Sequence, residues 1–258
     1  MLFHWIKIME DSNNNIYKFK EPLIRATLLK WNTQFTATVS LNGKEMTVHV
    51  PNTGRIGDVN IKNIPCLLSY HKDKKRKYKY DIEAVLLSDD DNWVGINQIL
   101  SNKIVEFFLE NNKLSEMIDS SEPIQREVKL GKSKLDFKVG NIYIEVKTPL
   151  ITINVKYGKN IKTKKTKPSS STERLAKHMK DLAQSLKKEE RAILLIVNQY
   201  RITENKPFEK STNYKKMKKI ITDSINSGVE IWNLELNFTP EGVSIHELKE
   251  TTDETLKL

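Results

Sequence analysis

Cysteine is almost absent from this chain, and so is any long hydrophobic run. Cys66 is the only cysteine among 258 residues, so the sequence holds no disulfide framework and no cysteine-based zinc site. The apolar opening is interrupted by His4 and Lys7 and lacks the basic start and cleavage signal of a secretory peptide. No later run reaches membrane-spanning length. These absences predict a soluble, cytoplasmic protein with no membrane partner.

Positive charge, by contrast, is in excess. The chain has 43 Lys+Arg against 33 Asp+Glu, a net charge of +10 and a pI near 9.4. This balance suits a polyanionic partner such as DNA or RNA. Most of the excess is lysine, in a chain that is also rich in isoleucine and asparagine, so compositional drift is an alternative source of the charge.

The stretch from Gln125 to Thr148 has the pattern of two tight β-hairpins. The dipeptides Gly131-Lys132 and Gly140-Asn141 separate three runs of alternating apolar and polar residues. Because a two-residue turn fixes the pairing of the strands on either side, the register follows from counting. We therefore expect three antiparallel strands whose apolar residues share a core face and whose charged residues share the other face.

This register places three carboxylates in one row. Asp136 falls opposite Glu145 across the second turn and opposite Glu127 across the first. Opposed side chains lie only ~5 Å apart, where like charges destabilise a sheet unless a cation lies between them. The alternative is an ordinary solvated sheet face, on which Lys134, Lys138 and Lys147 neutralise the acids.

Asp136 and the tripeptide Glu145-Val146-Lys147 also match the short D-x(n)-[D/E]-x-K pattern of PD-(D/E)XK nucleases. Phosphodiester hydrolysis of this kind uses a divalent metal held by hard oxygen ligands, with a position left for water. The sequence thus predicts Mg²⁺ or Mn²⁺ on Asp136 and Glu145, the carbonyl of Val146 and Glu127. Lys147, two residues after Glu145, points to the same face and can orient the attacking water or offset charge in the transition state.

The first ninety residues read as short strands without a helix. Asn42-Gly43 is a strong hairpin signal inside this series. Five strands with polar turns predict a small barrel of the OB type, and an open sheet is the alternative. The expected strands are residues 23–29, 34–41, 45–50, 65–71 and 78–87.

Two loops of this half are candidate nucleic-acid contacts. The turn that contains Asn52, Thr53, Gly54 and Arg55 could receive a phosphate on backbone amides and a guanidinium, or simply connect two strands. The run from Lys72 to Tyr80 mixes basic residues with two tyrosines, which suits a phosphate backbone and stacked bases. Edge lysines that prevent sheet association are the competing explanation. Its candidate contacts are Lys74, Lys75 and Arg76.

From residue 91 onward the periodicity gives helix, three strands, helix and a buried strand, the α-β-β-β-α-β order of a PD-(D/E)XK domain. The first helix is expected over 99–111, with Asn102 a possible cap, and the second over 173–187 after Thr172. On the second helix Arg174 and His178 share a face, where they either touch phosphate or form a surface pair. The predicted domains are 1–90, an OB-like barrel, and 91–258, a nuclease-like domain.

Several blocks, in order and over nearly the full chain, resemble the sugar fermentation stimulation protein A (SfsA) family. The resemblance implies an OB-like domain, a PD-(D/E)XK nuclease-like domain, DNA binding and a DNA/RNA nuclease activity. It places Glu127, Asp136, Glu145 and Lys147 at the family's acidic and lysine positions, and 52–55 at its barrel-loop motif. The blocks are HVPNTGR (49–55), WVGIN (93–97), SNKIVE (101–106), REVKLGKSKLDF (126–137), YIEVKT (143–148) and TERLAKHMKDL (172–182).

The sequence thus predicts a metal-dependent nuclease. The alternative is a DNA-binding regulatory protein that keeps the nuclease fold without cutting. Lys134 stands where the family usually has arginine, which implies altered contacts around the substrate.

Overall fold

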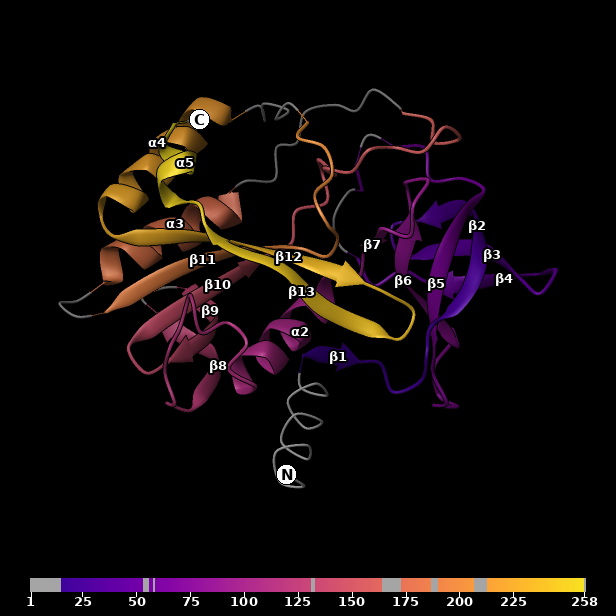
Figure 1. Ribbon diagram of the computed structural model, residues 1–258, viewed down its shortest axis with the longest axis horizontal. Helices are drawn as coiled ribbons and strands as arrows, with labels where there is room; N and C mark the ends of the chain where they lie inside the picture. The colour runs from indigo at the N-terminus through magenta and orange to yellow at the C-terminus, as the bar shows by residue number, and fades with distance from the viewer. Residues whose placement is uncertain are drawn as a thin grey trace, which may run out of the picture.

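The chain folds into a barrel and a larger mixed sheet covered by helices. The computed structural model describes residues 15–52, 56–57, 59–130, 133–163, 173–186, 190–206 and 213–257. In Figure 1 the barrel lies at the right and the larger sheet, with α3 and α4, at the left. No helix in these ranges is long and apolar enough to cross a membrane.

The barrel is formed by a sheet with the order β4-β3-β2-β5-β6-β7, closed by a pairing of β4 with β6. The closure is a single parallel bridge between His49 and Asp81. It confirms the predicted OB-like barrel and excludes the open sheet. The strands are β2 (Ile24–Thr33), β3 (Thr36–Leu41), β4 (Lys44–His49), β5 (Ile64–Tyr70), β6 (Tyr80–Leu86) and β7 (Trp93–Gly95).

Cys66 on β5 is fully buried in the barrel core, and this burial raises the pKa of its thiol to about 12. At pH 8 such a thiol has about a thousandfold less thiolate than one with the ordinary value near 9. We therefore expect a thiol reagent to label the native protein very slowly and the urea-unfolded protein at once. Stoichiometric labelling of the native protein within seconds would show that the barrel opens readily.

The larger sheet has seven strands in the order β1-β13-β12-β11-β10-β9-β8. The pairings β10–β11 and β11–β12 are parallel and the others are antiparallel. The three central strands are therefore the most deeply covered part of the domain. The strands are β1 (Ile16–Lys18), β8 (Ile124–Leu130), β9 (Ser133–Val139), β10 (Ile142–Lys147), β11 (Arg191–Asn198), β12 (Val229–Phe238) and β13 (Gly242–Glu250).

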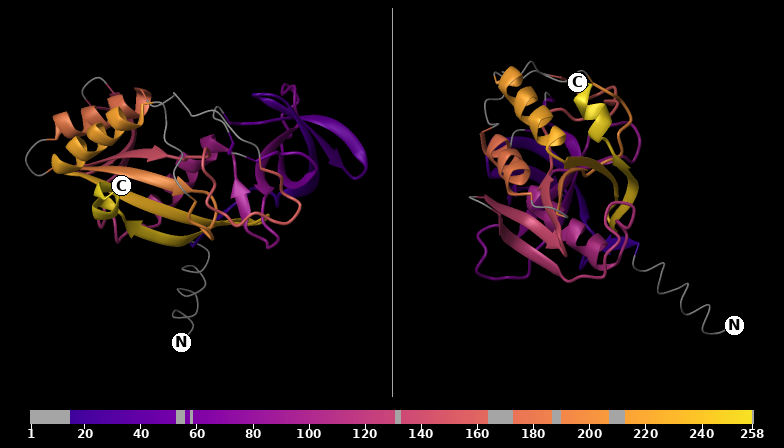
Figure 2. Two further views of the ribbon diagram at one scale, coloured as in Figure 1. Left: turned by 90° about the horizontal axis from the view of Figure 1, so that it is seen from above. Right: turned by 90° about the vertical axis from the view of Figure 1, so that its left-hand side faces the viewer.

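Helices cover both faces of this sheet, as the two views in Figure 2 show. Phe108 of α2 packs with Phe137 and Ile144 on one face, whereas Met179 of α3 and Ile220 of α4 pack on the other. This arrangement agrees with the predicted α-β-β-β-α-β order. The helices are α2 (Gln98–Glu110), α3 (Glu173–Ser185), α4 (Tyr214–Asn226) and α5 (Thr252–Leu256).

Two features lie differently from the sequence prediction. β1, on the N-terminal side of the division expected at residue 90, pairs with β13 in the larger sheet. The cap of α2 is Asn97, whose Oδ1 accepts hydrogen bonds from the amides of Ile99 and Leu100, and not Asn102. The proposed cap Thr172 of α3 lies outside the described residues.

Candidate active site

The second predicted hairpin has the expected register. Ile142, Tyr143 and Ile144 of β10 pair with Val139, Lys138 and Phe137 of β9, and Asp136 and Glu145 are the next residues of the two strands beyond these pairs. Gly140 in the turn has a φ of +56°, a backbone conformation that glycine adopts without strain. The hairpin therefore brings the two strand segments with the acids side by side, as predicted.

Asp136 is held by one group from each of two elements. Its Oδ2 accepts a hydrogen bond from the backbone amide of Val146 (2.8 Å), and its Oδ1 accepts one from Asn102 Nδ2 on α2 (2.8 Å). Because the Val146 amide belongs to the residue after Glu145, this contact fixes the Asp136 carboxylate beside the end of β10. Each carboxylate oxygen still has lone-pair capacity for a further partner.

Glu145 is buried, with 1% of its surface exposed. Its Oε1 accepts from Lys147 Nζ and lies 2.5 Å from His178 Nδ1 of α3. Its Oε2 is also buried and has no hydrogen-bond partner in the described part of the chain. An unsatisfied buried acceptor costs roughly 1–3 kcal/mol. A divalent cation on Oε2 would remove this cost, so the donor set fits a hard metal ion.

Lys147 stands at the open side of this group. Its side chain is 28% exposed, and its Nζ donates to Glu145 Oε1 and to the carbonyl of Val146 (3.3 Å). The ammonium is therefore held by its ion pair with Glu145 and is also accessible to solvent. A group in this position can orient a water molecule or stabilise negative charge on a substrate.

Glu127 does not join the predicted row of carboxylates. The strands β8 and β9 pair on either side of it, but Glu127 itself has a φ of +53° and its side chain is exposed. Its carboxylate forms an ion pair with Lys134 (2.6 Å), which lowers the pKa of Glu127. Among the residues that the structure describes, no group of three acids, histidines or cysteines could hold a metal. The structure brings together two of the three predicted carboxylates.

The expected division into a core face and a charged face is also wrong for β10. Five of its six residues are buried, including Tyr143 and Glu145 on the predicted polar face. The reason is that β10 lies inside a seven-stranded sheet with α3 across one face and α2 across the other. The acid of the site is therefore shielded from water on its α3 side, which strengthens its electrostatic interactions.

His178 contacts Glu145 and is not part of a surface pair. Only 6% of its surface is exposed, because its side chain extends from α3 to Glu145 of β10. Of the two alternatives for His178, its burial excludes the surface pair. A direct phosphate contact would require its side chain to leave Glu145. The Arg174 side chain lies outside what the structure describes. Asn102, which the sequence analysis treated as a possible cap, contacts Asp136 and belongs to the candidate site. The sequence feature that could have indicated this role is its polar side chain within the block SNKIVE (101–106).

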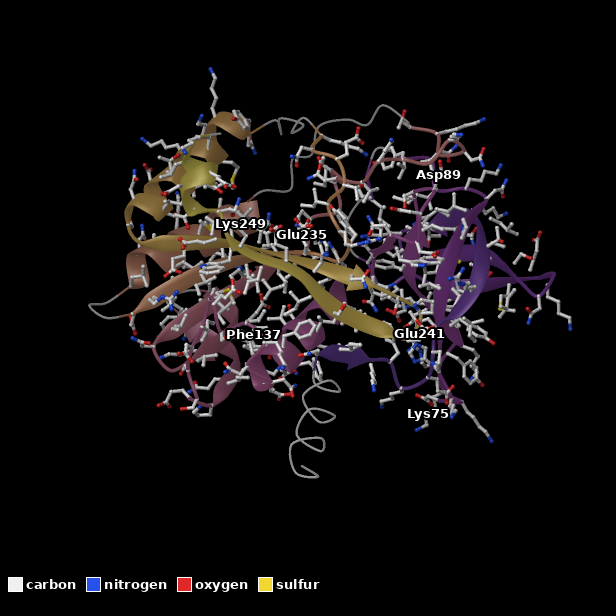
Figure 3. All side chains as sticks on the ribbon, viewed as in Figure 1. Lys75, Asp89, Phe137, Glu235, Glu241 and Lys249 are labelled. Carbon is white, nitrogen blue, oxygen red and sulfur yellow. The ribbon has the colours of Figure 1, made fainter. Side chains whose placement is uncertain are left out.

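The predicted barrel contacts lie apart from the acids. Lys74 and Lys75 are exposed at the β5–β6 hairpin, whereas Arg76 bonds to Asp81 (2.7 Å). Figure 3 shows Lys75 at the outer edge of the barrel, far from Phe137, the residue after Asp136. In the other predicted loop Asn52 is buried, and Thr53, Gly54 and Arg55 fall outside the described residues.

The contact with His178 predicts an effect on metal affinity. His178→Ala removes one of two groups that hold Oε1, so the Glu145 side chain gains freedom and Oε2 is less well placed. Removal of a group that orients a metal ligand typically weakens binding 10–100-fold, and we expect a loss of about tenfold, measured by calorimetric titration with Mn²⁺. His178→Gln retains a donor and should recover part of the affinity. Equal affinities for wild type and His178→Ala would contradict this role.

The barrel, the mixed sheet and the acidic pair with its lysine together define a two-domain protein with a PD-(D/E)XK nuclease-like fold. Two family models match the chain: the SfsA N-terminal OB domain over residues 30–96 and the sugar fermentation stimulation protein RE domain over residues 99–242. The chain therefore belongs to the sugar fermentation stimulation protein (SfsA) family.

Similar proteins agree with this assignment. A sugar fermentation stimulation protein homolog of Synechococcus sp. strain JA-2-3B'a(2-13) is 33% identical over 233 residues, which cover 88% of this chain and 92% of the relative. The homolog of Alcanivorax borkumensis is 31% identical over 234 residues, covering 85% and 94%. The solved structure of Pyrococcus furiosus SfsA in complex with Ca²⁺ superposes with a TM-score of 0.69 at 20% identity, over 90% of this chain and 96% of that one. The last comparison supports the fold.

Proposed function

We propose that this protein is a Mg²⁺- or Mn²⁺-dependent nuclease that hydrolyses phosphodiester bonds of DNA or RNA. The observation that carries the proposal is the buried Oε2 of Glu145, which has no partner among the described residues and belongs to the strand fixed beside Asp136. A buried carboxylate oxygen without a donor is costly, and a hard cation is the partner that this chemistry favours. The Ca²⁺ bound by the Pyrococcus furiosus relative is a cation of the same hard, oxygen-seeking kind.

In this proposal Asp136, Glu145 and the carbonyl of Val146 hold the metal. A bound Mg²⁺ or Mn²⁺ would supply Lewis-acid activation of the phosphate and of the attacking water. Asn102 and the Val146 amide keep the Asp136 carboxylate in place, and His178 keeps Glu145 in place. A ligand role for Glu127 stays a prediction, because its side chain would first have to leave Lys134.

Lys147 would act on the substrate and not on the metal. Its ammonium donates hydrogen bonds to Glu145 Oε1 and to the Val146 carbonyl. It therefore lies next to two of the proposed metal ligands. From there it can hold the nucleophilic water in line with the phosphorus or stabilise charge on the phosphoryl oxygens. Because Lys147 is partly exposed, a substrate can approach it without rearrangement of the sheet.

The barrel and the basic hairpin would bind a part of the polynucleotide that lies away from the cleavage point. Lys74 and Lys75 are exposed on the barrel, and OB-type barrels commonly bind oligonucleotides. Contacts of this kind with the phosphate backbone weaken steeply as salt rises. We therefore expect binding by the whole protein in EDTA, without cleavage, and a marked loss of affinity between low and high salt.

Incubation with labelled single- and double-stranded DNA and RNA tests the proposal directly. Cleavage in Mg²⁺ or Mn²⁺ that stops with EDTA and returns with added metal supports the nuclease. Salt-sensitive binding with no cleavage under any metal supports the non-cutting, DNA-binding regulatory protein instead. Cleavage that persists in EDTA would contradict the assignment of Asp136 and Glu145 as metal ligands.

A further inference from the structure

The barrel and the nuclease-like domain meet at a buried polar pair, Glu83 and Asn97. Glu83 on β6 and Asn97 before α2 are 5% and 8% exposed. Asn97 Nδ2 donates to Glu83 Oε2 at 2.7 Å, and the amide of Ile96 donates to the Glu83 carbonyl at 2.8 Å. Glu83 Oε1 accepts from Ser69 of the barrel at 2.6 Å. Both oxygens of a buried carboxylate are thus bound, one within the barrel and one across the junction.

Asn97 connects this junction to the start of α2. While its Nδ2 binds Glu83, its Oδ1 accepts from the amides of Ile99 and Leu100, at 3.1 and 3.2 Å. Its carbonyl also accepts from Gln199 Nε2 at 2.9 Å. A side chain whose two polar atoms are bound to different elements cannot move without breaking one of these bonds. The position of the barrel therefore determines where α2 begins.

The first turns of α2 in turn contact the proposed metal site. Ser101 Oγ accepts from Thr148 Oγ1 (2.7 Å), one residue after Lys147, and Asn102 donates to Asp136. Five residues of an α-helix span only about 7.5 Å, so displacement of Asn97 would shift Asn102 as well. Asp136, Asn102, Asn97 and Glu83 thus form a connected series.

We propose that Glu83 and Asn97 are positioning residues for the nuclease site: they place α2 so that Asn102 holds the Asp136 carboxylate beside the Val146 amide. The barrel is then part of the catalytic arrangement as well as a binding module. The catalytic meaning of this inference rests on the proposed function. Its structural content does not, because the Asn102–Asp136–Val146 contacts can be measured without metal or substrate.

The test exchanges the hydrogen-bond donor and acceptor between positions 97 and 83 by substitution. Asn97→Asp keeps an oxygen to cap α2 but sets a carboxylate against Glu83, so the junction is disrupted. Adding Glu83→Gln supplies an amide donor for that new carboxylate and restores the hydrogen bond with the roles exchanged. Glu83→Gln alone should have a smaller effect, because the new side-chain amide can turn its oxygen toward Asn97 Nδ2 and donate from its nitrogen to Ser69 Oγ, whose hydroxyl hydrogen then turns away.

The readout is hydrogen exchange of the Val146 amide in the full-length, metal-free protein. In Asn97→Asp we expect Val146 to exchange about tenfold faster relative to central amides of β11 and β12, since its acceptor Asp136 is less well held. The double variant should return to within about twofold of wild type. The matched control is Asn92→Ala, which removes the buried contacts of Asn92 with Arg201 near the junction but leaves α2 capped. It should not change the Val146 ratio, which is the exchange rate of the Val146 amide divided by that of the central amides of β11 and β12.

Calorimetric titration with Mn²⁺ then separates the two proposals. Weaker binding in Asn97→Asp and recovery in the double variant support both. If wild type binds no metal, the nuclease proposal fails while the Val146 ratio still decides the role of the junction. An unchanged ratio in Asn97→Asp, or a double variant that stays as impaired or as unfolded as Asn97→Asp, would overturn the positioning role.

Discussion

Asp136→Asn should abolish metal-dependent cleavage while leaving nucleic-acid binding intact. The substitution keeps the shape of the side chain but removes the charge that a divalent ion requires. It also places an amide donor against either the Val146 amide or Asn102 Nδ2, both of which are donors. Metal ions contribute several kcal/mol to transition-state stabilisation, so we expect the cleavage rate to fall by about a thousandfold or more. Single-turnover cleavage with saturating Mg²⁺ measures the loss.

The matched control is Asp119→Asn, which makes the same chemical change at an exposed acid on the connection between α2 and β8. It should cleave at the wild-type rate. Both variants should bind a labelled oligonucleotide in EDTA within about twofold of wild type, because neither changes the basic residues that we propose to contact phosphate. Metal-dependent cleavage by Asp136→Asn within tenfold of wild type would show that Asp136 is not a ligand.

The parts of the site that sequence could predict are those with local causes. The turn at Gly140 and the alternation on either side of it fix the pairing of β9 with β10, so Asp136 and Glu145 could be brought together by counting. The α-β-β-β-α-β order followed from periodicity in the same way. Both depend on neighbours within a few residues, which a single sequence displays directly.

The parts that could not be predicted have distant or unusual causes. Glu145 is buried because α3, about thirty residues further on, covers β10, and no pattern within β10 shows this. Glu127 turns away because its backbone adopts a left-handed conformation, which sequence statistics disfavour for glutamate. β1 pairs with β13 across more than two hundred residues. For Glu145 and β1, contacts with remote segments overrode the local pattern, and for Glu127 an unusual backbone conformation did.

Lys147→Met should separate metal binding from turnover. Methionine keeps much of the aliphatic length but has no ammonium, so Glu145 Oε1 retains only His178, and the Val146 carbonyl loses its contact with Nζ. Removal of a positive charge beside two ligands does not weaken their attraction for a cation, so Mn²⁺ affinity should stay the same or increase. The cleavage rate should fall by roughly 10²–10³-fold, the usual cost of losing a group that stabilises transition-state charge.

The control for Lys147→Met is Lys138→Met, the same change on the neighbouring strand, where the ammonium lies 4.5 Å from the ring centre of Tyr143. It should cleave normally, with at most a small loss of stability from the lost cation–π contact. The cleavage rates and Mn²⁺ affinities of the two variants distinguish two possible roles of Lys147. If Lys147→Met loses metal affinity in proportion to activity, the lysine serves to organise the ligands; if affinity is kept while cleavage is lost, it acts on the substrate.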